Sequence, residues 1–282
     1  MTTLDKGLAH GSWLDRALTG AVIALAVVWV LPLLWVLALS FKPNAALQLG
    51  HHPWYLPPFT LGNYTDILGT SQLFVWIVNS CIVALAQAVL VLSLSSLAGY
   101  AFASLRFPGR RLLYAFVLAG LAVPQAAYIA PLHRLFADWQ LHNTYTALVL
   151  PGVALPFGVF LMTQTFKAIP AELQEAALLD NASRWTVFWK VLLPLTRPAQ
   201  ATLGVFTFLG AWNDYLWPVT SATQSSMYTL TLGLASMQTN FAQSEGLGFL
   251  MAQAVFAAVP VLLLYAFFQR HIIAAVAGGT VK

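Results

Sequence analysis

Charged side chains are scarce in this sequence of 282 residues. Aspartate, glutamate, lysine and arginine together make up 8% of the chain, whereas 59% of the residues are hydrophobic and the mean hydropathy is +0.75. A soluble domain of ordinary composition carries about 25% charged residues. This chain therefore has too few charges to cover a surface in water, and its composition predicts a membrane protein.

Three further absences exclude classes of function. The single cysteine, Cys81, lies in an apolar run, so no disulfide can form within the chain, and we expect a buried, unreactive thiol. No glycine is followed by lysine, which excludes a G-x-x-x-x-G-K phosphate loop and hence an ATPase site in this chain. The six histidines are scattered, and none joins a metal-ligand cluster or a Ser/His/Asp arrangement, so the sequence predicts neither a metal site nor an enzyme.

Long apolar runs recur along the chain. Because a run of about 20 residues crosses a bilayer as a helix, we expect an all-α membrane protein with six transmembrane helices. The predicted spans are residues 17–39, 73–105, 112–132, 144–166, 199–220 and 247–268. We expect Pro124 and Pro131 to distort the third span. The segments 42–72, 133–143 and 221–245 are expected to be loops that share one side of the membrane.

Basic residues are distributed unevenly between the two sides. Lysine and arginine occur in the N-terminal segment, in the turn at 105–111, in the loop at 167–198 and at the C-terminal end, whereas the opposite side carries only Lys42 and Arg134. Positively charged loops remain in the cytoplasm. The predicted organisation is therefore a cytoplasmic segment at 1–16, a transmembrane domain at 17–271 with a cytoplasmic loop at 167–198, and a cytoplasmic tail at 272–282.

The segment from Pro170 to Pro198 is the longest polar interruption in the second half of the chain. It predicts two short helices: Pro170 suits a first turn, Asn181 tolerates a left-handed bend and Ser183 caps the second helix. Pro194 and Pro198 are expected to end that helix. Four residues share a face of the first helix by their spacing: Leu173, Ala176, Ala177 and Asp180. Periodicity alone is equally compatible with an amphipathic connector on the membrane surface.

The same segment resembles the EAA loop of ABC-importer permeases, in which E-A-A precedes a glycine-centred bend and a later L-P. The matching residues are Glu175, Ala176, Ala177, Asp180, Asn181, Ala182, Phe188, Val191, Leu193 and Pro194. Asn181 replaces the usual glycine, which predicts a stiffer bend. The resemblance implies a coupling helix that docks in a cleft of a separate ATP-binding subunit. Small alanines allow close approach, and Glu175 offers a charge to an arginine.

The stretch W-N-D-Y-L-W-P, Trp212 to Pro218, is similar to a segment of carbohydrate-type ABC permeases. Asp214 is the only acid in the apolar part of the chain, and an intramembrane carboxylate usually faces a cavity or a partner. The alternative is that Asp214 lies near the end of its span and caps a helix. The resemblance further implies that Asn213, Tyr215 and Trp217 bind sugar by hydrogen bonding and stacking.

Residues 102–111 and the ending from Phe268 to Lys282 also resemble maltose-type permeases, so the resemblance extends over nearly the whole chain. It implies the type I fold and the role of a permease subunit in a bacterial importer of sugars or oligosaccharides, in the inner membrane. Its implied partners are a second homologous permease, two copies of an ATP-binding subunit that holds ATP and magnesium, a solute-binding protein and the lipid bilayer, but no nucleic acid. The chain itself would bind no cofactor. An ATP-independent secondary transporter or channel is the alternative, although no internal repeat supports it.

Overall fold

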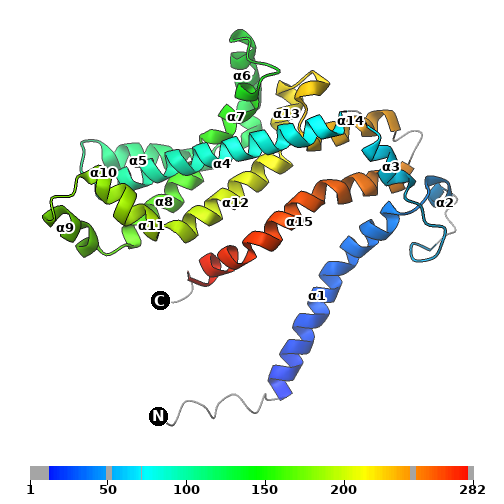
Figure 1. Ribbon diagram of the computed structural model, residues 1–282, viewed down its shortest axis with the longest axis horizontal. Helices are drawn as coiled ribbons and strands as arrows, with labels where there is room; N and C mark the ends of the chain where they lie inside the picture. Colours follow the sequence, from blue (N-terminus) through cyan, green and yellow to red (C-terminus); the bar gives the residue numbers. More distant parts are fainter. Residues whose placement is uncertain (1–12, 49–52, 71, 242–245, 279–282) are drawn as a thin grey trace. The chain divides into compact units, whose positions relative to one another are not determined.

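Helices are the only regular secondary structure in the part of the chain that the computed structural model describes, residues 13–48, 53–70, 72–241 and 246–278 (Figure 1). This confirms the predicted all-α class. Two compact units are formed, the first by residues 1–69 with 238–256 and the second by residues 70–237 with 257–282. Most of the predicted segment at 1–16 and the end of the predicted tail, residues 279–282, lie outside the described residues.

The helices follow one another in chain order. The first unit contains α1 (Trp13–Ser40), α2 (Asn44–Gln48) and α3 (Gly62–Leu68). The second unit begins with α4 (Leu73–Ser104), α5 (Arg110–Ala119), η1 (Gly120–Ala122), α6 (Gln125–Asp138), α7 (Tyr145–Val153) and α8 (Pro156–Ala168). It continues with α9 (Ala171–Leu179), α10 (Arg184–Thr186), η2 (Val187–Leu192), α11 (Leu193–Leu195), α12 (Arg197–Asn213), α13 (Leu216–Ser221) and η3 (Ser225–Met227). Residues of α14 (Leu230–Phe241) and α15 (Gly246–Gly278) belong to both units.

Several helices are long and apolar enough to cross a membrane. Among the described residues, Asp15–Ser40, Leu73–Ser104 and Gly246–Leu263 meet this condition singly. Two bent pairs raise the number to as many as five: α5–η1 with α6, bent by 101°, and α7 with α8, bent by 46°. The first bend falls at Pro124, as predicted, because proline starts a helix more readily than it continues one. A chain that crosses the membrane several times is confirmed, whereas the count of six spans stays a prediction.

Some predicted boundaries were wrong. The span predicted at 199–220 is divided into α12 and α13 by a break at Asp214 and Tyr215. The loop predicted at 133–143 starts only after α6 ends at Asp138, and α2 and α3 lie within the loop predicted at 42–72. The loop predicted at 221–245 contains α14, in which Leu230, Leu234 and Met237 are buried at helical spacing. Cys81 is half-buried rather than buried.

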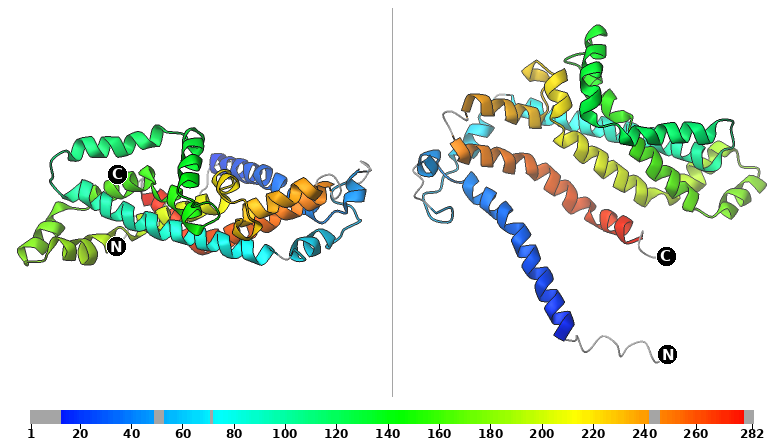
Figure 2. Two further views of the ribbon diagram at one scale, coloured as in Figure 1. Left: turned by 90° about the horizontal axis from the view of Figure 1, so that it is seen from above. Right: turned by 180° about the vertical axis from the view of Figure 1, so that it is seen from behind.

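The second unit is built along α4. Helices α7, α8 and α12 pack against it, and the views in Figure 2 show α4, α8 and α12 side by side. Gly99 permits the close approach of α8, because a Cβ at this position would lie only 2.7 Å from the Cβ of Met162. Small residues commonly bring membrane helices together in this way. The two helices thus meet almost backbone to backbone.

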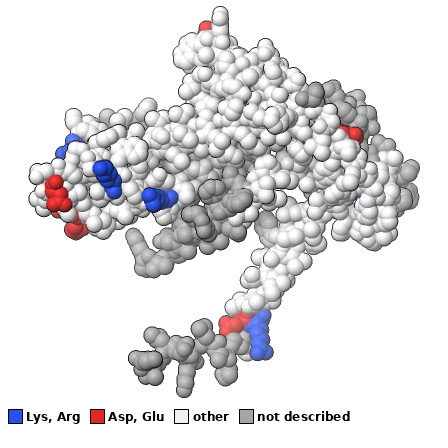
Figure 3. Space-filling view, viewed as in Figure 1, with Lys and Arg blue, Asp and Glu red and all other residues white. Residues whose placement is uncertain are grey.

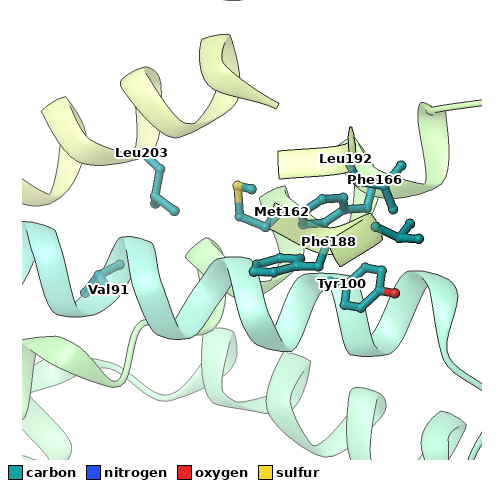
Figure 4. Close-up of a cluster of buried hydrophobic side chains, with 8 residues drawn as sticks. Val91, Tyr100, Met162, Phe166, Phe188, Leu192 and Leu203 are labelled. Carbon is teal, nitrogen blue, oxygen red and sulfur yellow. The ribbon is translucent and has the colours of Figure 1, made fainter. Parts of the chain in front are cut away.

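The C-terminal end of α4 enters a buried apolar cluster (Figure 4). The ring of Tyr100 lies 5.1 Å from that of Phe188 and 5.9 Å from that of Phe166, centroid to centroid. Its hydroxyl donates a long hydrogen bond of 3.3 Å to the carbonyl of Arg184. The full cluster consists of Val91, Tyr100, Met162, Phe166, Val187, Phe188, Leu192 and Leu203. Packing therefore joins α4 to the segment that follows α8.

The N-terminal end of α4 is held by hydrogen bonds instead. The donors and acceptors are Trp76 Nε1 to the Ser225 carbonyl (2.9 Å), Asn79 Nδ2 to the carbonyls of Ser226 and Tyr228 (2.9 Å each), Tyr145 Oη to Asn79 Oδ1 (2.6 Å) and the Leu230 amide to Ser80 Oγ (2.7 Å). These bonds fix the chain between α13 and α14 to α4 and α7.

A lysine is buried in the first unit. Lys42 has no exposed surface, and its ammonium group donates to the carbonyl of Leu56 and lies 4.7 Å from the ring centroid of Phe59. Asn63 donates from Nδ2 to the carbonyls of Ser40 (2.8 Å) and Lys42 (3.0 Å). Both of these polar side chains therefore hold the connection between α1 and α3 together.

Candidate functional site

The polar segment predicted to contact a partner, residues 167–198, is here called the coupling segment. It contains α9, α10, η2 and α11 and lies at one end of the second unit, beside the C-terminal end of α4 (Figure 1). Figure 3 shows acidic and basic side chains gathered on this end of the unit. Charged side chains thus gather at the end of the second unit where the predicted docking residues lie.

The bend after α9 has a defined hydrogen-bond pattern. Asn181 adopts φ of 58°, and its amide donates to the carbonyl of Leu178, while the amide of Ala182 donates to that of Ala177 (3.1 Å each). This is a Schellman motif, which requires a left-handed residue at the position of Asn181. The expectation that Asn takes over the role of glycine here is confirmed. Ala177 and Ala182 both pack against the apolar cluster and close the bend from inside.

Most of α9 is exposed, and only Gln174 and Ala177 are half-buried. Glu172, Glu175, Ala176 and Leu179 are all exposed and follow the spacing i, i+3, i+4 and i+7, so they form one stripe. Leu179 is 83% exposed, which is unusual for a large apolar side chain. The face predicted from spacing is divided in the structure, because Ala177 packs inward while Leu173, Ala176 and Asp180 are exposed. Glu175 and Ala176 are thus exposed, whereas Ala177 is half-buried.

The second half of the segment differs from the prediction at its end. Ser183 Oγ accepts the backbone N–H of Thr186 at 3.1 Å, so the predicted cap is confirmed. The helix then passes through the π-helical stretch η2 and continues through Leu193 and Pro194, which are half-buried, to Leu195. Pro194 therefore does not end the helix, and Pro198 lies in the first turn of α12. Proline fits a first turn because the N–H it lacks would have no partner there.

A pocket of about 560 Å³ lies elsewhere in the second unit, next to the break between α12 and α13. Its polar lining comes from α4, α6, α12 and the residues of the break: Gln87, Gln125, Tyr128, Thr207, Asn213, Asp214 and Tyr215. Apolar walls are supplied by residues such as Ile129, Leu132, Phe206 and Trp217. Among the described residues no lysine or arginine lines the pocket, so the site presents amides, hydroxyl groups and one carboxylate.

All four residues predicted for the pathway border this pocket, but they differ in environment. Asp214 accepts the backbone N–H groups of Leu216 (3.1 Å) and Trp217 (3.4 Å), so its carboxylate caps α13 while it lines the pocket. Asn213 and Tyr215 are exposed. Trp217 is buried and donates from Nε1 to the Ala147 carbonyl at 2.7 Å, which makes it part of the wall. The two interpretations of Asp214 are therefore compatible.

The sequence did not identify four polar lining residues: Gln87, Gln125, Tyr128 and Thr207. Gln87 is buried in the middle of α4 and donates from Nε2 to the Leu148 carbonyl at 3.0 Å. An amide isolated in an apolar span was a recognisable signal, since polar groups are costly in lipid and usually find a partner. Gln125 and Tyr128 lie just after Pro124, and only the bend of 101° brings them to the pocket.

Comparisons with known proteins agree with this architecture. Residues 92–278 match the family described as "Binding-protein-dependent transport system inner membrane component". The chain is 36% identical to the diacetylchitobiose uptake system permease protein NgcG of Streptomyces coelicolor, over 95% of this chain and 90% of that protein. It is 35% identical to the arabinooligosaccharides transport system permease protein AraQ of Halalkalibacterium halodurans, over 96% of each chain.

A third relative and a solved structure extend the comparison. The trehalose transport system permease protein SugB of Mycobacterium tuberculosis is 31% identical over 95% of this chain and 98% of that protein. A chain of a bacterial ABC transporter involved in the import of alginate shares the fold with a TM-score of 0.78 at 22% identity, over 92% of this chain and 98% of that chain. The protein belongs to the family of binding-protein-dependent transport system inner membrane components, the permease subunits of ABC importers.

Proposed function

We propose that this permease forms half of the translocation path for a neutral sugar or oligosaccharide. The observation that carries the proposal is the lining of the 560 Å³ pocket, where the described residues offer amide and hydroxyl groups and one carboxylate but no basic side chain. Such groups exchange hydrogen bonds with sugar hydroxyls, whereas an anionic solute would favour lysine or arginine. The names of the relatives, which refer to diacetylchitobiose, arabinooligosaccharides and trehalose, also support a carbohydrate.

Energy for transport comes, in this proposal, from a separate subunit that binds ATP and magnesium. Two copies of that subunit dock at the coupling segments of this chain and of a second, homologous permease. The exposed stripe of α9 supports this assignment, because Leu179 offers an apolar projection and Glu175 a charge that an arginine can pair. A solute-binding protein delivers the sugar from the opposite side, and a solved relative in complex with such a periplasmic protein supports that arrangement.

The proposed orientation places both termini and the coupling segment in the cytoplasm. Its support is the distribution of lysine and arginine along the chain. The structure adds one consistent feature, since the turn between α4 and α5 lies at the same end of the second unit as the coupling segment (Figure 2). Residues 17–271 then form the transmembrane domain, with residues 1–16 and 272–282 on the cytoplasmic side.

Uptake by the complete importer tests the substrate class. The importer is placed in proteoliposomes with ATP inside and offered radiolabelled neutral oligosaccharides, in parallel with sugar phosphates. We expect uptake of a neutral sugar, and Asp214→Asn should reduce that uptake because it removes the charge while it retains one cap oxygen. Thr220→Ala, a change to a hydroxyl that bonds within α13, serves as control. Uptake of sugar phosphates alone would contradict the proposal.

A charge reversal tests the docking assignment separately. Glu175→Lys should abolish co-purification of the ATP-binding subunit, since it places a cation where an arginine of the partner would bind. Asp138→Lys reverses another exposed carboxylate, on α6, and should leave co-purification unchanged. Normal recovery of the ATP-binding subunit with the Glu175 variant would show that docking depends on another surface.

A further inference from the structure

Three arginines lie at the turn that joins α4 to α5, Arg106 in the turn itself and Arg110 and Arg111 at the start of α5. Arg106 and Arg111 are exposed, and Arg110 is half-buried. Within the described residues none of the three forms an ion pair, and the one hydrogen bond of their side chains runs from Arg110 Nη1 to the carbonyl of Leu105 at 2.9 Å. The turn therefore presents three positive charges that no carboxylate of the described chain balances.

These arginines surround a concave surface. Together with Phe107, Gly109 and Leu112 they line a pocket of about 470 Å³. Gly109, with φ of +76°, reverses the chain, and the ring of Phe107 is anchored 6.1 Å from that of Phe102 on α4. The shape of the turn is thus set by the backbone and by aromatic packing, so most of the N–H donors of the arginines stay available to a ligand.

An apolar surface starts where the basic pocket ends. Leu112 is 78% exposed and Phe116 76% exposed, and their spacing of i and i+4 places them on one face of α5. Such a face is suited to the acyl chains of a bilayer. A ligand that satisfies both surfaces has an anionic head and a hydrocarbon chain.

We propose that the turn between α4 and α5 binds an anionic glycerophospholipid, with its phosphate among Arg106, Arg110 and Arg111 and an acyl chain along Leu112 and Phe116. Arginine binds phosphate oxygens through two parallel N–H donors. Basic clusters next to a membrane helix bind acidic head groups of the cytoplasmic leaflet.

Two other anionic ligands fit this site less well. Free phosphate matches the arginines but leaves Leu112 and Phe116 uncovered, and so does an acidic protein surface. The inference uses the membrane orientation proposed above, but neither the sugar nor the contact with the ATP-binding subunit. Its test therefore fails or succeeds separately from the tests of transport and docking.

The experiment is native mass spectrometry of the delipidated importer complex in mild detergent. Phosphatidylglycerol and phosphatidylcholine with identical acyl chains are titrated in parallel, with glycerol 1-phosphate as competitor. We expect the wild-type complex to bind phosphatidylglycerol in preference to phosphatidylcholine. The double variant Arg106→Gln with Arg111→Gln should bind phosphatidylglycerol with an affinity lower by about thirtyfold, because two charges near the membrane surface are lost. Arg110 is retained because it also bonds the turn. Arg134→Gln on α6 is the matched control and should change nothing.

Each other outcome would overturn the proposal. Equal binding of the two lipids, or unchanged binding of phosphatidylglycerol by the double variant, would show that the arginines do not form a head-group site. Displacement of phosphatidylglycerol by an equal concentration of glycerol 1-phosphate would identify a site for free anions. Loss of the ATP-binding subunit from the double variant in pure phosphatidylcholine nanodiscs would assign the arginines to a protein contact. If the double variant does not accumulate, the wild-type comparison of lipids and the competition decide.

Discussion

The two ends of α4 are attached to their surroundings by different forces. At the C-terminal end, Tyr100 meets Phe166 and Phe188 through ring contacts, and one long hydrogen bond accompanies them. At the N-terminal end, Asn79 alone takes part in three hydrogen bonds of 2.6–2.9 Å. Apolar packing has little directional preference, whereas hydrogen bonds weaken steeply when their geometry changes.

This difference indicates what each end is suited to do. A contact without strong direction allows the coupling segment to shift by small amounts along α4 while it stays attached. The directional bonds at Asn79 hold the chain between α13 and α14 in one position. In a permease that is driven from one side, we expect the apolar contact at the C-terminal end of α4 to allow small movements of the coupling segment. We expect the hydrogen bonds at the N-terminal end of α4 to keep the chain between α13 and α14 in place.

The largest effect should come from removing the centre of the apolar contact. Phe188 is 1% exposed, and Phe188→Ala should lower the free energy of unfolding by about 3–5 kcal/mol through the cavity it leaves. Thermal unfolding of the purified complex measures the loss. Trp189→Ala removes a neighbouring ring that is 50% exposed and should cost far less. Similar losses for both variants would show that burial in the cluster does not hold the coupling segment.

A smaller loss is expected from crowding the interface of α4 with α8. In Gly99→Ala the new Cβ would lie 2.7 Å from the Cβ of Met162 and 2.9 Å from backbone atoms, so the helices must separate, at a cost of about 1–3 kcal/mol. Gly20→Ala on α1 meets nothing within 4 Å and should be neutral or stabilising, by up to about 1 kcal/mol. A melting temperature unchanged in the Gly99 variant would contradict the close approach of the helices.

The hydrogen-bonded end is tested through Asn79. Asn79→Ala leaves the carbonyls of Ser226 and Tyr228 without this donor, which should cost about 1–3 kcal/mol and release the chain near η3. Hydrogen exchange should accelerate at residues 225–230 and stay unchanged at 184–195. Ser93→Ala, which removes a hydroxyl bonded within α4, is the control. Accelerated exchange at both ends would mean that the two attachments are not independent.

The smallest effect concerns the hydrogen bonds of the apolar end. Ser183→Ala removes the cap of α10 and should cost about 1 kcal/mol, with faster exchange confined to residues 184–187. Ser183→Asp restores an acceptor and should recover the loss. A cost as large as that of Phe188→Ala would show that hydrogen bonds matter as much here as at Asn79, and the contrast between the two ends would disappear.

Local features of the coupling segment were predictable from the sequence because they depend on neighbouring residues. The left-handed Asn181 and the capping Ser183 each follow from short-range chemistry. The continuation of the helix through Pro194 was not predictable, because it depends on the burial of Leu192 in the apolar cluster and on the π-helical stretch before it.

Only one part of the pocket lining was predicted from the sequence. The stretch from Asn213 to Trp217 was recognisable as a group, whereas Gln125 and Tyr128 reach the same pocket through the bend at Pro124. A proline indicates that a helix is interrupted but does not give the angle, which depends on packing between elements distant in sequence. The division of the predicted span at Asp214 was missed for a related reason, because apolar residues continue on both sides of the break.

The near contact of α4 and α8 at Gly99 has a mechanical consequence. Two helices that meet backbone to backbone have no layer of flexible side chains between them to absorb a displacement. The end of α8 leads directly into the coupling segment, and from Gly99 α4 runs back over 20 residues, or about 30 Å, to the hydrogen bonds at Asn79. A displacement that reaches α8 would therefore pass to α4 as a tilt of the two helices together, with little lost to deformation between them.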